Sequence, residues 1–261
     1  TVRVVPNKCP ALLSHGEPTL TKQGLYEGCE AVGAHEVVIE TPRHVASFSR
    51  LTEQESRLLI RAYVDRLQSL RCVDNVKYAL IFKNLGPEAG ASLEHAHSQI
   101  VAMPIVPPEL RCELDAAERL FKKDGACFFC RMIEDELSHG RRLVATSDRF
   151  IAVCPFASRV PFELWVLPRD HCSHFEALGV DSASELAGFL QAILKKLESQ
   201  HPYLAYNYFV HTGPFDVNAM AHYHWHIEVL PRLTTTAGLE WGAGCYINPV
   251  LPENAAAALR R

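Results

Sequence analysis

The sequence predicts an α+β fold in which one unit, a mostly antiparallel sheet with one main helix, occurs twice in tandem. The first observation is an internal repeat: an apolar, strand-like run closes with a proline and a histidine at His44, and a second such run closes at His171. The second is a strand-like run that opens with a His-x-His pair at His95 and again at His224. The spacing agrees, because 51 positions separate His44 from His95 and 53 separate His171 from His224.

Each copy predicts the same elements in the same order. An amphipathic helix follows the first strand, and in both copies it opens on a capping box, Thr52 with Glu55 and Ser182 with Glu185. A second apolar strand comes next, and the histidine strand closes the unit. The expected strands are 36–44, 78–82 and 95–101 in the first copy and 162–171, 206–210 and 224–230 in the second.

The repeat divides the chain into two domains. We assign residues 1–115 to the first copy, which carries the candidate nucleophile, and residues 116–261 to the second, which carries a candidate structural zinc site. We expect the two copies to share one extended sheet or to pack as a pseudo-dimer.

The composition is that of an ordinary globular protein, and we expect its partners to be small molecules. The chain has 261 residues, of which 48% are hydrophobic and 21% charged, and its formal net charge of -4 argues against non-specific binding to nucleic acid. No apolar run approaches the roughly 18 residues of a membrane span, so we expect no membrane association and a cytoplasmic location. The nine cysteines contain one close pair and do not indicate a disulfide framework.

The run His95-Ala-His97-Ser-Gln99, behind the loop Gly90-Ala91-Ser92, predicts chemistry on a phosphate. Residues at i and i+2 of a strand share a face, so His95 can anchor the strand while His97 presents a ring nitrogen as nucleophile. The Gln99 amide shares that face and can donate to a phosphoryl oxygen without acid-base chemistry, which favours transfer over hydrolysis. Backbone N–H groups of the loop could hold the same oxygens.

A zinc site is predicted in the second copy. Cys127 and Cys130 have the spacing of a zinc knuckle, and His171 and His224 would complete a closed, structural Cys2His2 site. A redox pair and two merely buried cysteines are the alternatives. His44 and His95 are the equivalent residues of the first copy, where we expect half of a zinc site, its cysteine pair lying roughly twenty residues before Thr1.

Other histidines are expected to be solvated in loops or at helix ends. They are His15, His35, His139, His174 and His201.

Several runs resemble the galactose-1-phosphate uridylyltransferases of the histidine-triad superfamily over essentially the whole chain. They are Arg3–Leu12, Gly86–Gln99, His211–Pro214, Tyr223–His226 and Gly244–Pro249. The resemblance implies two histidine-triad-like units, with His97 carrying the nucleotide as a phosphoramidate and Gln99 holding the α-phosphate. It further implies phosphate contacts by Asn84 and Ser92, nucleoside contacts near Asn7, and a homodimer in which segment 240–247 closes the partner's site.

The resemblance leaves two substrate pairs open. One is UDP-glucose with a hexose 1-phosphate such as galactose 1-phosphate. The other is ADP-glucose with phosphate, since an ADP-glucose phosphorylase branch shares the non-proline motif around Ala96 and the second cysteine pair. A histidine-triad nucleotide hydrolase and a non-enzymatic zinc scaffold are alternatives from other classes.

The resemblance also implies a second way to hold a metal. Some members of the family bind iron or zinc near the second histidine strand. The corresponding set would be Glu113, His211, His224 and His226. Because both sets need His224, they exclude each other, and we favour the set that contains thiolates.

Overall fold

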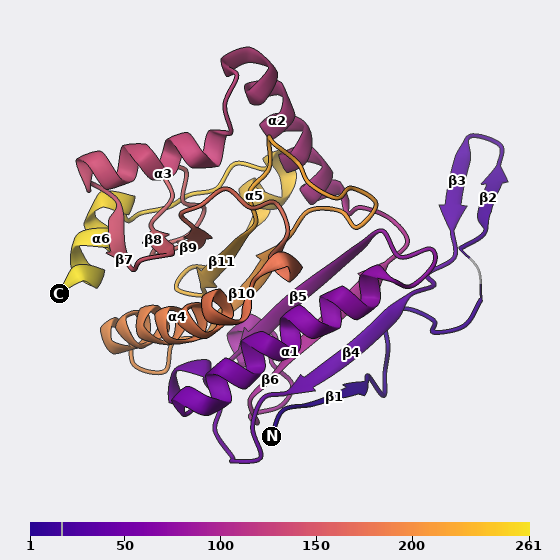
Figure 1. Cartoon of the computed structure of the whole chain (residues 1–261), viewed down its shortest axis with the longest axis horizontal. Helices are drawn as coiled ribbons and strands as arrows, with labels where there is room; N and C mark the ends of the chain where they lie inside the picture. The colour runs from indigo at the N-terminus through magenta and orange to yellow at the C-terminus, as the bar shows by residue number, and fades with distance from the viewer. Residues whose placement is uncertain (17) are drawn as a thin grey trace.

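A nine-stranded antiparallel sheet runs through the centre of the molecule (Figure 1). The computed structural model describes residues 1–16 and 18–261. The strand order is β1-β4-β6-β5-β10-β11-β9-β8-β7. The strands are β1 Arg3–Pro6, β4 Ala34–Ile39, β5 Tyr78–Leu85, β6 His97–Met103, β7 Leu143–Thr146, β8 Phe150–Val153, β9 Leu164–Pro168, β10 Tyr206–His211 and β11 His226–Pro231.

The two copies share this one sheet. The order β1-β4-β6-β5 of the first copy is repeated in reverse as β10-β11-β9-β8 in the second, so the halves meet where β5 pairs with β10. That junction runs from Leu85 opposite Tyr206 to Ile81 opposite Val210. The extended sheet is therefore the correct one of the two expected arrangements, and it places the end of β5 beside elements of the second copy.

Helices cover both faces of the sheet. The main helix predicted for each copy is present, as α1 and α4, and these two helices pack on one face over a core of strand residues such as Val38, Ile81 and Ile100. On the other face, α2 and α3 pack against a smaller core that includes Tyr78 of β5 and Leu167 of β9. The helices are α1 Glu53–Arg71, α2 Pro108–Asp124, α3 Phe128–His139, α4 Val180–Gln200, α5 Gly238–Ala243 and α6 Pro252–Arg260.

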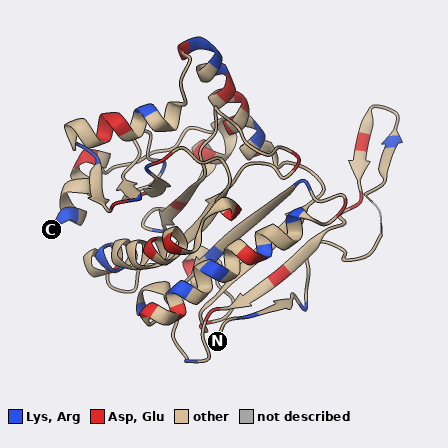
Figure 2. Cartoon of the chain, in the orientation of Figure 1, with Lys and Arg blue, Asp and Glu red and all other residues tan. Residues whose placement is uncertain are grey.

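The connection between the copies is helical. The division expected between residues 115 and 116 falls inside α2, so this helix joins the two halves. Basic and acidic side chains are interspersed along α1 and α2 (Figure 2). No helix in the described part of the chain is both long and apolar enough to span a membrane.

The capping box predicted for α1 is confirmed, whereas the one predicted for α4 is wrong. Thr52 Oγ1 accepts from the Glu55 N–H at 3.2 Å, and Glu55 Oε2 accepts from the Thr52 N–H at 2.8 Å. Helix α4 starts at Val180 after Gly179, so Ser182 lies within its first turn. Glu185 instead accepts from Ser147 Oγ at 2.6 Å and pairs with an arginine of the β7–β8 turn.

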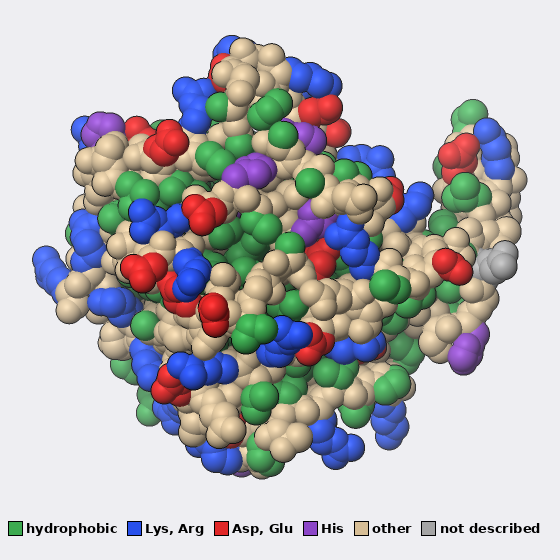
Figure 3. All heavy atoms as spheres, viewed as in Figure 1, with side chains coloured by type: hydrophobic (Ala, Val, Ile, Leu, Met, Phe, Trp, Pro, Cys, Tyr) green, Lys and Arg blue, Asp and Glu red, His purple; other side chains and the backbone are tan. Residues whose placement is uncertain are grey.

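A short hairpin projects from the body of the molecule. Its strands are β2 Leu20–Gln23 and β3 Tyr26–Cys29, which form a separate two-stranded sheet. All of their residues are exposed, and the arm carries hydrophobic side chains at the edge of the surface in Figure 3.

Candidate active site

His97 is the first residue of β6, and its side chain lies on the sheet face opposite α1. Burial alternates along this strand, so that Ser98 and Ile100 are buried while His97 and Gln99 are half-buried. His97 and Gln99 therefore share a face, as the sequence predicts.

The tautomer of the neutral His97 ring is set by its own strand. Its Nδ1 lies 2.8 Å from the carbonyl oxygen of His95. Because a carbonyl oxygen only accepts hydrogen bonds, Nδ1 carries the proton and donates it to this bond. In the neutral ring the lone pair is then on Nε2, which is the form that a nucleophilic imidazole requires.

His97 lines a cavity of about 950 Å³ at the end of the sheet. The walls of this His97 cavity come from both copies, because Glu198 and Tyr203 of the second copy stand beside residues of the first. The predicted site residues among its lining are His44, Asn84, Ala91, Ser92, His95 and His97.

The loop 86–92, called the glycine loop below, is tightly folded against the second copy. Gly86 and Gly90 have φ of 83° and 82°, a region that favours glycine, and a Cβ at Gly86 would lie 2.8 Å from the Cβ of Ala205. The N–H of Gly90 donates to Pro87 O at 2.9 Å and that of Ala91 to Gly86 O at 3.0 Å.

These bonds correct one prediction. The N–H groups of Gly90 and Ala91 are used by the turn itself, so they do not hold a phosphoryl oxygen in this conformation. Ser92 remains the predicted phosphate-binding residue of the loop that lines the cavity.

Gln99 is oriented by His35, one of the histidines that were expected to be solvated in loops or at helix ends. His35 lies on β4, where its Nδ1 accepts from the Ala11 N–H at 3.0 Å. The other ring nitrogen, Nε2, therefore bears the proton and donates to Gln99 Oε1 at 2.8 Å. Asn7 Nδ2 lies 3.5 Å from the same oxygen, so Gln99 keeps its NH2 group for another partner. Extending the expected strand back to residue 34 could have placed His35 on β4, where it lies opposite Val101 of β6.

A buried ion pair lies behind His97, and the sequence patterns did not predict it either. Lys83 Nζ donates to Glu40 Oε1 at 2.8 Å and to the carbonyl oxygen of His97 at 3.1 Å. The side chains of Lys83 and Glu40 are 1% and 0% exposed. The start of β6 is therefore tied to a buried charge pair.

The predicted zinc ligands come together. Cys127, Cys130, His171 and His224 place one ligand atom each within 4.8 Å of one another. Nε2 of His171 donates to the Met220 carbonyl at 3.1 Å and Nε2 of His224 to the Pro168 carbonyl at 2.8 Å, so both Nδ1 atoms face the cluster.

The chemistry of this donor set suits Zn²⁺. Burial lowers the pKa of His224 to about 4, so the ring is neutral near pH 7 and can serve as a ligand. Burial and the neighbouring Cys127 raise the pKa of Cys130 to about 12, an effect that a bound dication would reverse. Two thiolates and two neutral imidazoles form the closed set of a structural zinc site.

The first copy repeats half of this geometry. His95 Nε2 lies 2.7 Å from the Thr41 carbonyl, matching the bond of His224 to Pro168, and the rings of His44 and His95 are 5.7 Å apart. These two histidines thus occupy the places expected for them.

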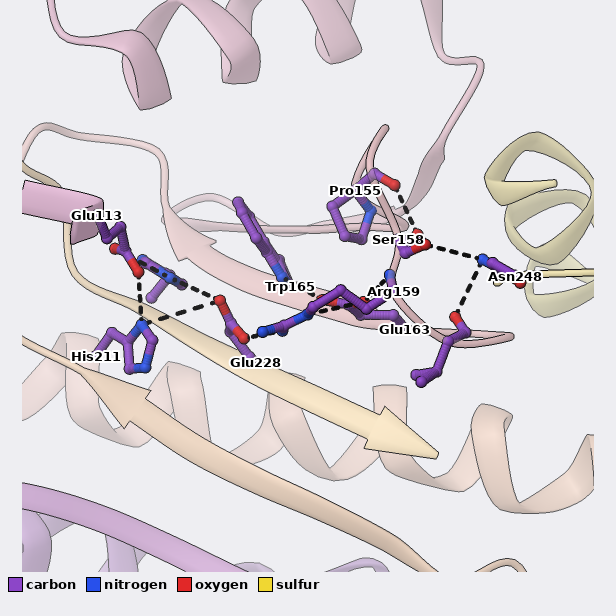
Figure 4. A network of polar contacts seen from close by, with 11 residues as sticks. Glu113, Pro155, Ser158, Arg159, Glu163, Trp165, His211, Glu228 and Asn248 are labelled. Atoms are coloured by element: carbon purple, nitrogen blue, oxygen red, sulfur yellow. Dashed lines mark hydrogen bonds and ion pairs between the residues drawn. The ribbon is translucent and has the colours of Figure 1, made fainter. Parts of the chain in front are cut away.

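A second cluster of possible ligands lies between α2 and the sheet (Figure 4). It contains Glu113, His211, His226 and Glu228. The predicted alternative set is therefore wrong in one member, because His224 belongs to the cysteine cluster and Glu228 takes its place. The two clusters share no residue and do not exclude each other.

The second cluster is also a network of ion pairs. His211 Nδ1 lies 2.9 Å from Glu113 Oε2, and Arg159 pairs with Glu228 and, at 2.7 Å, with Glu163. Burial would raise the pKa of Glu228, but His226, His211 and Arg159 hold it at about 2. Arg159 thus already neutralises one carboxylate of this cluster.

His174, another of the histidines that were expected to be solvated, is buried. Its Nδ1 lies 2.8 Å from Ser173 Oγ and its Nε2 lies 3.1 Å from the Pro214 carbonyl. Close packing explains the difference, since the backbone of Gly213 lies against the ring.

The sequence relatives of the chain identify the class of protein to which this duplicated half-sheet and its His-x-His-x-Gln strand belong. A family model described as a domain of unknown function, DUF4921, matches residues 23–260. The chain is 36% identical to ADP-glucose phosphorylase of Arabidopsis thaliana, over 99% of this chain and 74% of that protein. It is 31% identical to galactose-1-phosphate uridylyltransferase of Thermotoga maritima, over 97% of this chain and 82% of that protein.

The solved structures agree. The structure of the Arabidopsis thaliana ADP-glucose phosphorylase with bound ADP-glucose superposes with a TM-score of 0.88 at 35% identity, covering 100% of this chain and 82% of that one. The chain therefore belongs to the DUF4921 family and, with these relatives, to the galactose-1-phosphate uridylyltransferase family.

Proposed function

We propose that the protein transfers a nucleotidyl group between phosphates through a covalent intermediate on His97. The observation that carries the proposal is the bond from His97 Nδ1 to the His95 carbonyl, which leaves the Nε2 lone pair available at the wall of the cavity. Membership of the family supports it, because the relatives named above act on nucleotide sugars or sugar phosphates.

The reaction consists of two displacements at one site. In the first, Nε2 of His97 forms a bond to the α-phosphorus of a nucleotide sugar while the bond from that phosphorus to the oxygen of the sugar 1-phosphate breaks. The ring becomes cationic, and its remaining proton stays on Nδ1 in the bond to the His95 carbonyl. In the second, an oxygen of a sugar 1-phosphate or of inorganic phosphate attacks the same phosphorus and releases His97.

The neighbouring residues bind and orient the phosphate. Ser92 and Asn84 line the cavity and would donate to phosphoryl oxygens, and the NH2 group of Gln99 would do the same from the face that it shares with His97. Asn7, next to Gln99, would contact the nucleoside. Since an amide cannot take a proton from water, Gln99 favours transfer over hydrolysis.

Two substrate pairs fit this mechanism. The leading proposal is uridylyl transfer from UDP-glucose to a hexose 1-phosphate such as galactose 1-phosphate, supported by the Thermotoga maritima relative. The second is adenylyl transfer from ADP-glucose to phosphate, favoured by the Arabidopsis thaliana relative and by Ala96 between the motif histidines.

We further propose that the cysteine cluster holds a structural zinc ion and that the protein forms a homodimer. The zinc ion would be held by Cys127, Cys130, His171 and His224 and would fix α3 to the strands without touching substrate. For the dimer, segment 240–247 supplies an exposed surface that includes Trp241, 80% exposed, and Ile247, 61% exposed.

The covalent intermediate is tested by mass spectrometry of the intact protein after brief, separate incubations with UDP-glucose and ADP-glucose. A uridylyl or an adenylyl adduct identifies the nucleotide. His97→Gly is expected to form neither adduct, while the matched variant His15→Gly, at an exposed position, is expected to behave as wild type. Absence of any adduct on the zinc-loaded wild type would contradict covalent transfer.

A further inference from the structure

Asn207 is a side chain of the second copy that lies against the glycine loop of the first. It stands on β10 directly opposite Asn84 on β5, because the two are a register pair at the centre of the sheet. Asn207 Nδ2 donates to Asn84 Oδ1 at 2.7 Å and to the Ala89 carbonyl at 2.8 Å. Its Oδ1 accepts from Arg232 Nε at 2.6 Å. One amide therefore links β5, the glycine loop and the chain that follows β11.

The orientation of both amides in this chain of bonds is forced by chemistry. A guanidinium group has only donors, so Asn207 must turn its oxygen towards Arg232. A carbonyl oxygen only accepts, so Asn207 must turn its NH2 group towards Ala89. The same NH2 group donates to Asn84, so Asn84 must turn its oxygen towards Asn207. The NH2 group of Asn84 is thereby left on the opposite side.

That NH2 group lies beside the glycine loop. A Cβ built on Gly90 would lie 3.8 Å from Asn84 Nδ2, which places the nitrogen beside the loop. Asn84 also lines the cavity together with His97 and Ser92. With the opposite orientation, the amide oxygen would face the substrate and repel the phosphoryl oxygens.

We propose that Asn207, held by Arg232, is a positioning residue that fixes the Asn84 amide so that it donates to the α-phosphoryl group during transfer to His97. The inference rests on the proposed function and deepens it. It gives the second copy a direct part in the site of the first, since both positioning side chains come from residues after 200.

Asn207→Asp is the variant that tests this role, because it keeps the shape of the side chain while it replaces the NH2 donor with an oxygen and adds a negative charge. The carboxylate still accepts from Arg232 but cannot donate to Ala89 or Asn84, so Asn84 turns its NH2 group towards Asp and its oxygen towards the cavity. We expect the single-turnover rate constant of adduct formation, at saturating nucleotide sugar, to fall by at least about tenfold. The concentration that gives half of the maximal rate should change by less than about threefold, because the lost interaction acts mainly in the transition state.

Two comparisons separate positioning from a structural role. Asn218→Asp makes the same change at an exposed residue whose Oδ1 accepts from Arg71, and it is expected to leave the rate unchanged. In an Asn84→Ala background, Asn207→Asp should reduce the rate by less than about twofold further, because it acts through Asn84. An undiminished rate for Asn207→Asp, or the same tenfold loss in the Asn84→Ala background, overturns the inference.

Arg232→Ala provides a second variant should Asn207→Asp fold poorly. Arg232 is exposed, and without it Asn207 is still oriented by Ala89, so we expect a smaller loss of about two- to fivefold. A rate equal to wild type in this variant would count against the role of Arg232. A wild type that forms no adduct overturns the proposed function and this inference with it, which distinguishes the two failures.

Discussion

Gln99 and Glu228 are equivalent positions on the two halves of the sheet. Gln99 stands opposite Phe82 and Glu228 opposite Phe209, and these two phenylalanines are themselves a register pair where the halves meet. One position carries a neutral amide on the strand face that it shares with His97, which lines the cavity. The other carries a carboxylate that is 3% exposed.

This difference explains why the two copies are not two sites. His226, the equivalent of His97, is fully buried and stacks on Trp165 with ring centroids 5.0 Å apart. Glu228 also forms an ion pair with Arg159, whose side chain lies beside it. The first copy therefore keeps an accessible histidine, whereas the second has filled the corresponding place with its own side chains.

Glu228→Gln is expected to destabilise the fold. The change removes the charge that pairs with Arg159 and lies near His226, and it leaves a neutral amide in its place. Arg159 keeps Glu163 as a partner at 2.7 Å, so we expect a loss of about 1–3 kcal/mol in the free energy of unfolding. Urea denaturation at pH 7 measures it, with Glu94→Gln as the control at a side chain that is 91% exposed. Equal midpoints for wild type and Glu228→Gln would contradict the role of this network.

The contribution of Glu228 to stability should disappear at low pH. Its pKa is about 2 in the folded protein and 4.5 as the reference value, so the unfolded chain takes up a proton first as the pH falls. The stabilisation is therefore fully present above about pH 5 and is lost progressively towards pH 2. The difference in unfolding free energy between wild type and Glu228→Gln, measured at several pH values, should narrow over this range. A constant difference from pH 7 to pH 3 would exclude Glu228 as its source.

Lys83→Met should be among the most destabilising substitutions in the chain. It would leave the carboxylate of Glu40 buried at 0% exposure without its cation, an effect of about 3–5 kcal/mol. Replacing both residues, with Lys83→Met and Glu40→Leu together, should recover most of this loss because no charge then remains buried. Thermal and urea unfolding of the two variants make the comparison. A double variant no more stable than Lys83→Met would show that packing, not charge, is responsible.

The parts of the site that the sequence could predict are those that a local pattern, such as strand alternation or cysteine spacing, indicates. The alternation of the 95–101 strand placed His97 and Gln99 on one face, and the spacing of Cys127 and Cys130 together with the repeat identified the four clustered ligands. Both signals need only residues that are near one another in sequence or related by the repeat.

The residues that were missed act across strands. His35 reaches Gln99 over 64 positions and Asn207 reaches Asn84 over 123. A local pattern can place each residue on a strand, but the strand register decides which partner it meets. The error at Ser182 has the same origin. A capping pattern is present there, but tertiary partners on the β7–β8 turn bind Glu185, and the helix starts earlier.

The two capping patterns should therefore respond differently to the same substitution. Thr52→Ala removes an observed cap of α1 and is expected to lower the unfolding free energy by about 1 kcal/mol. Ser182→Ala lies inside α4, where alanine is the better helix former, and should be neutral or slightly stabilising. Paired urea denaturation curves test both. If Ser182→Ala lowered the unfolding free energy as much as Thr52→Ala, Ser182 would act as a cap in solution, contrary to the structure.

Zinc should depend on Cys130 and not on the second cluster. Cys130→Ser removes one of four ligands that lie within 4.8 Å of one another, so we expect loss of bound zinc, measured by elemental analysis of the purified protein, together with a lower melting temperature. Cys112→Ser, at an exposed cysteine, is the matched control and should keep both. His211→Ala should keep the zinc as well, since His211 belongs to the cluster in which Arg159 already neutralises Glu228. Zinc that survives Cys130→Ser but is lost in His211→Ala would place the metal between Glu113 and Glu228 instead.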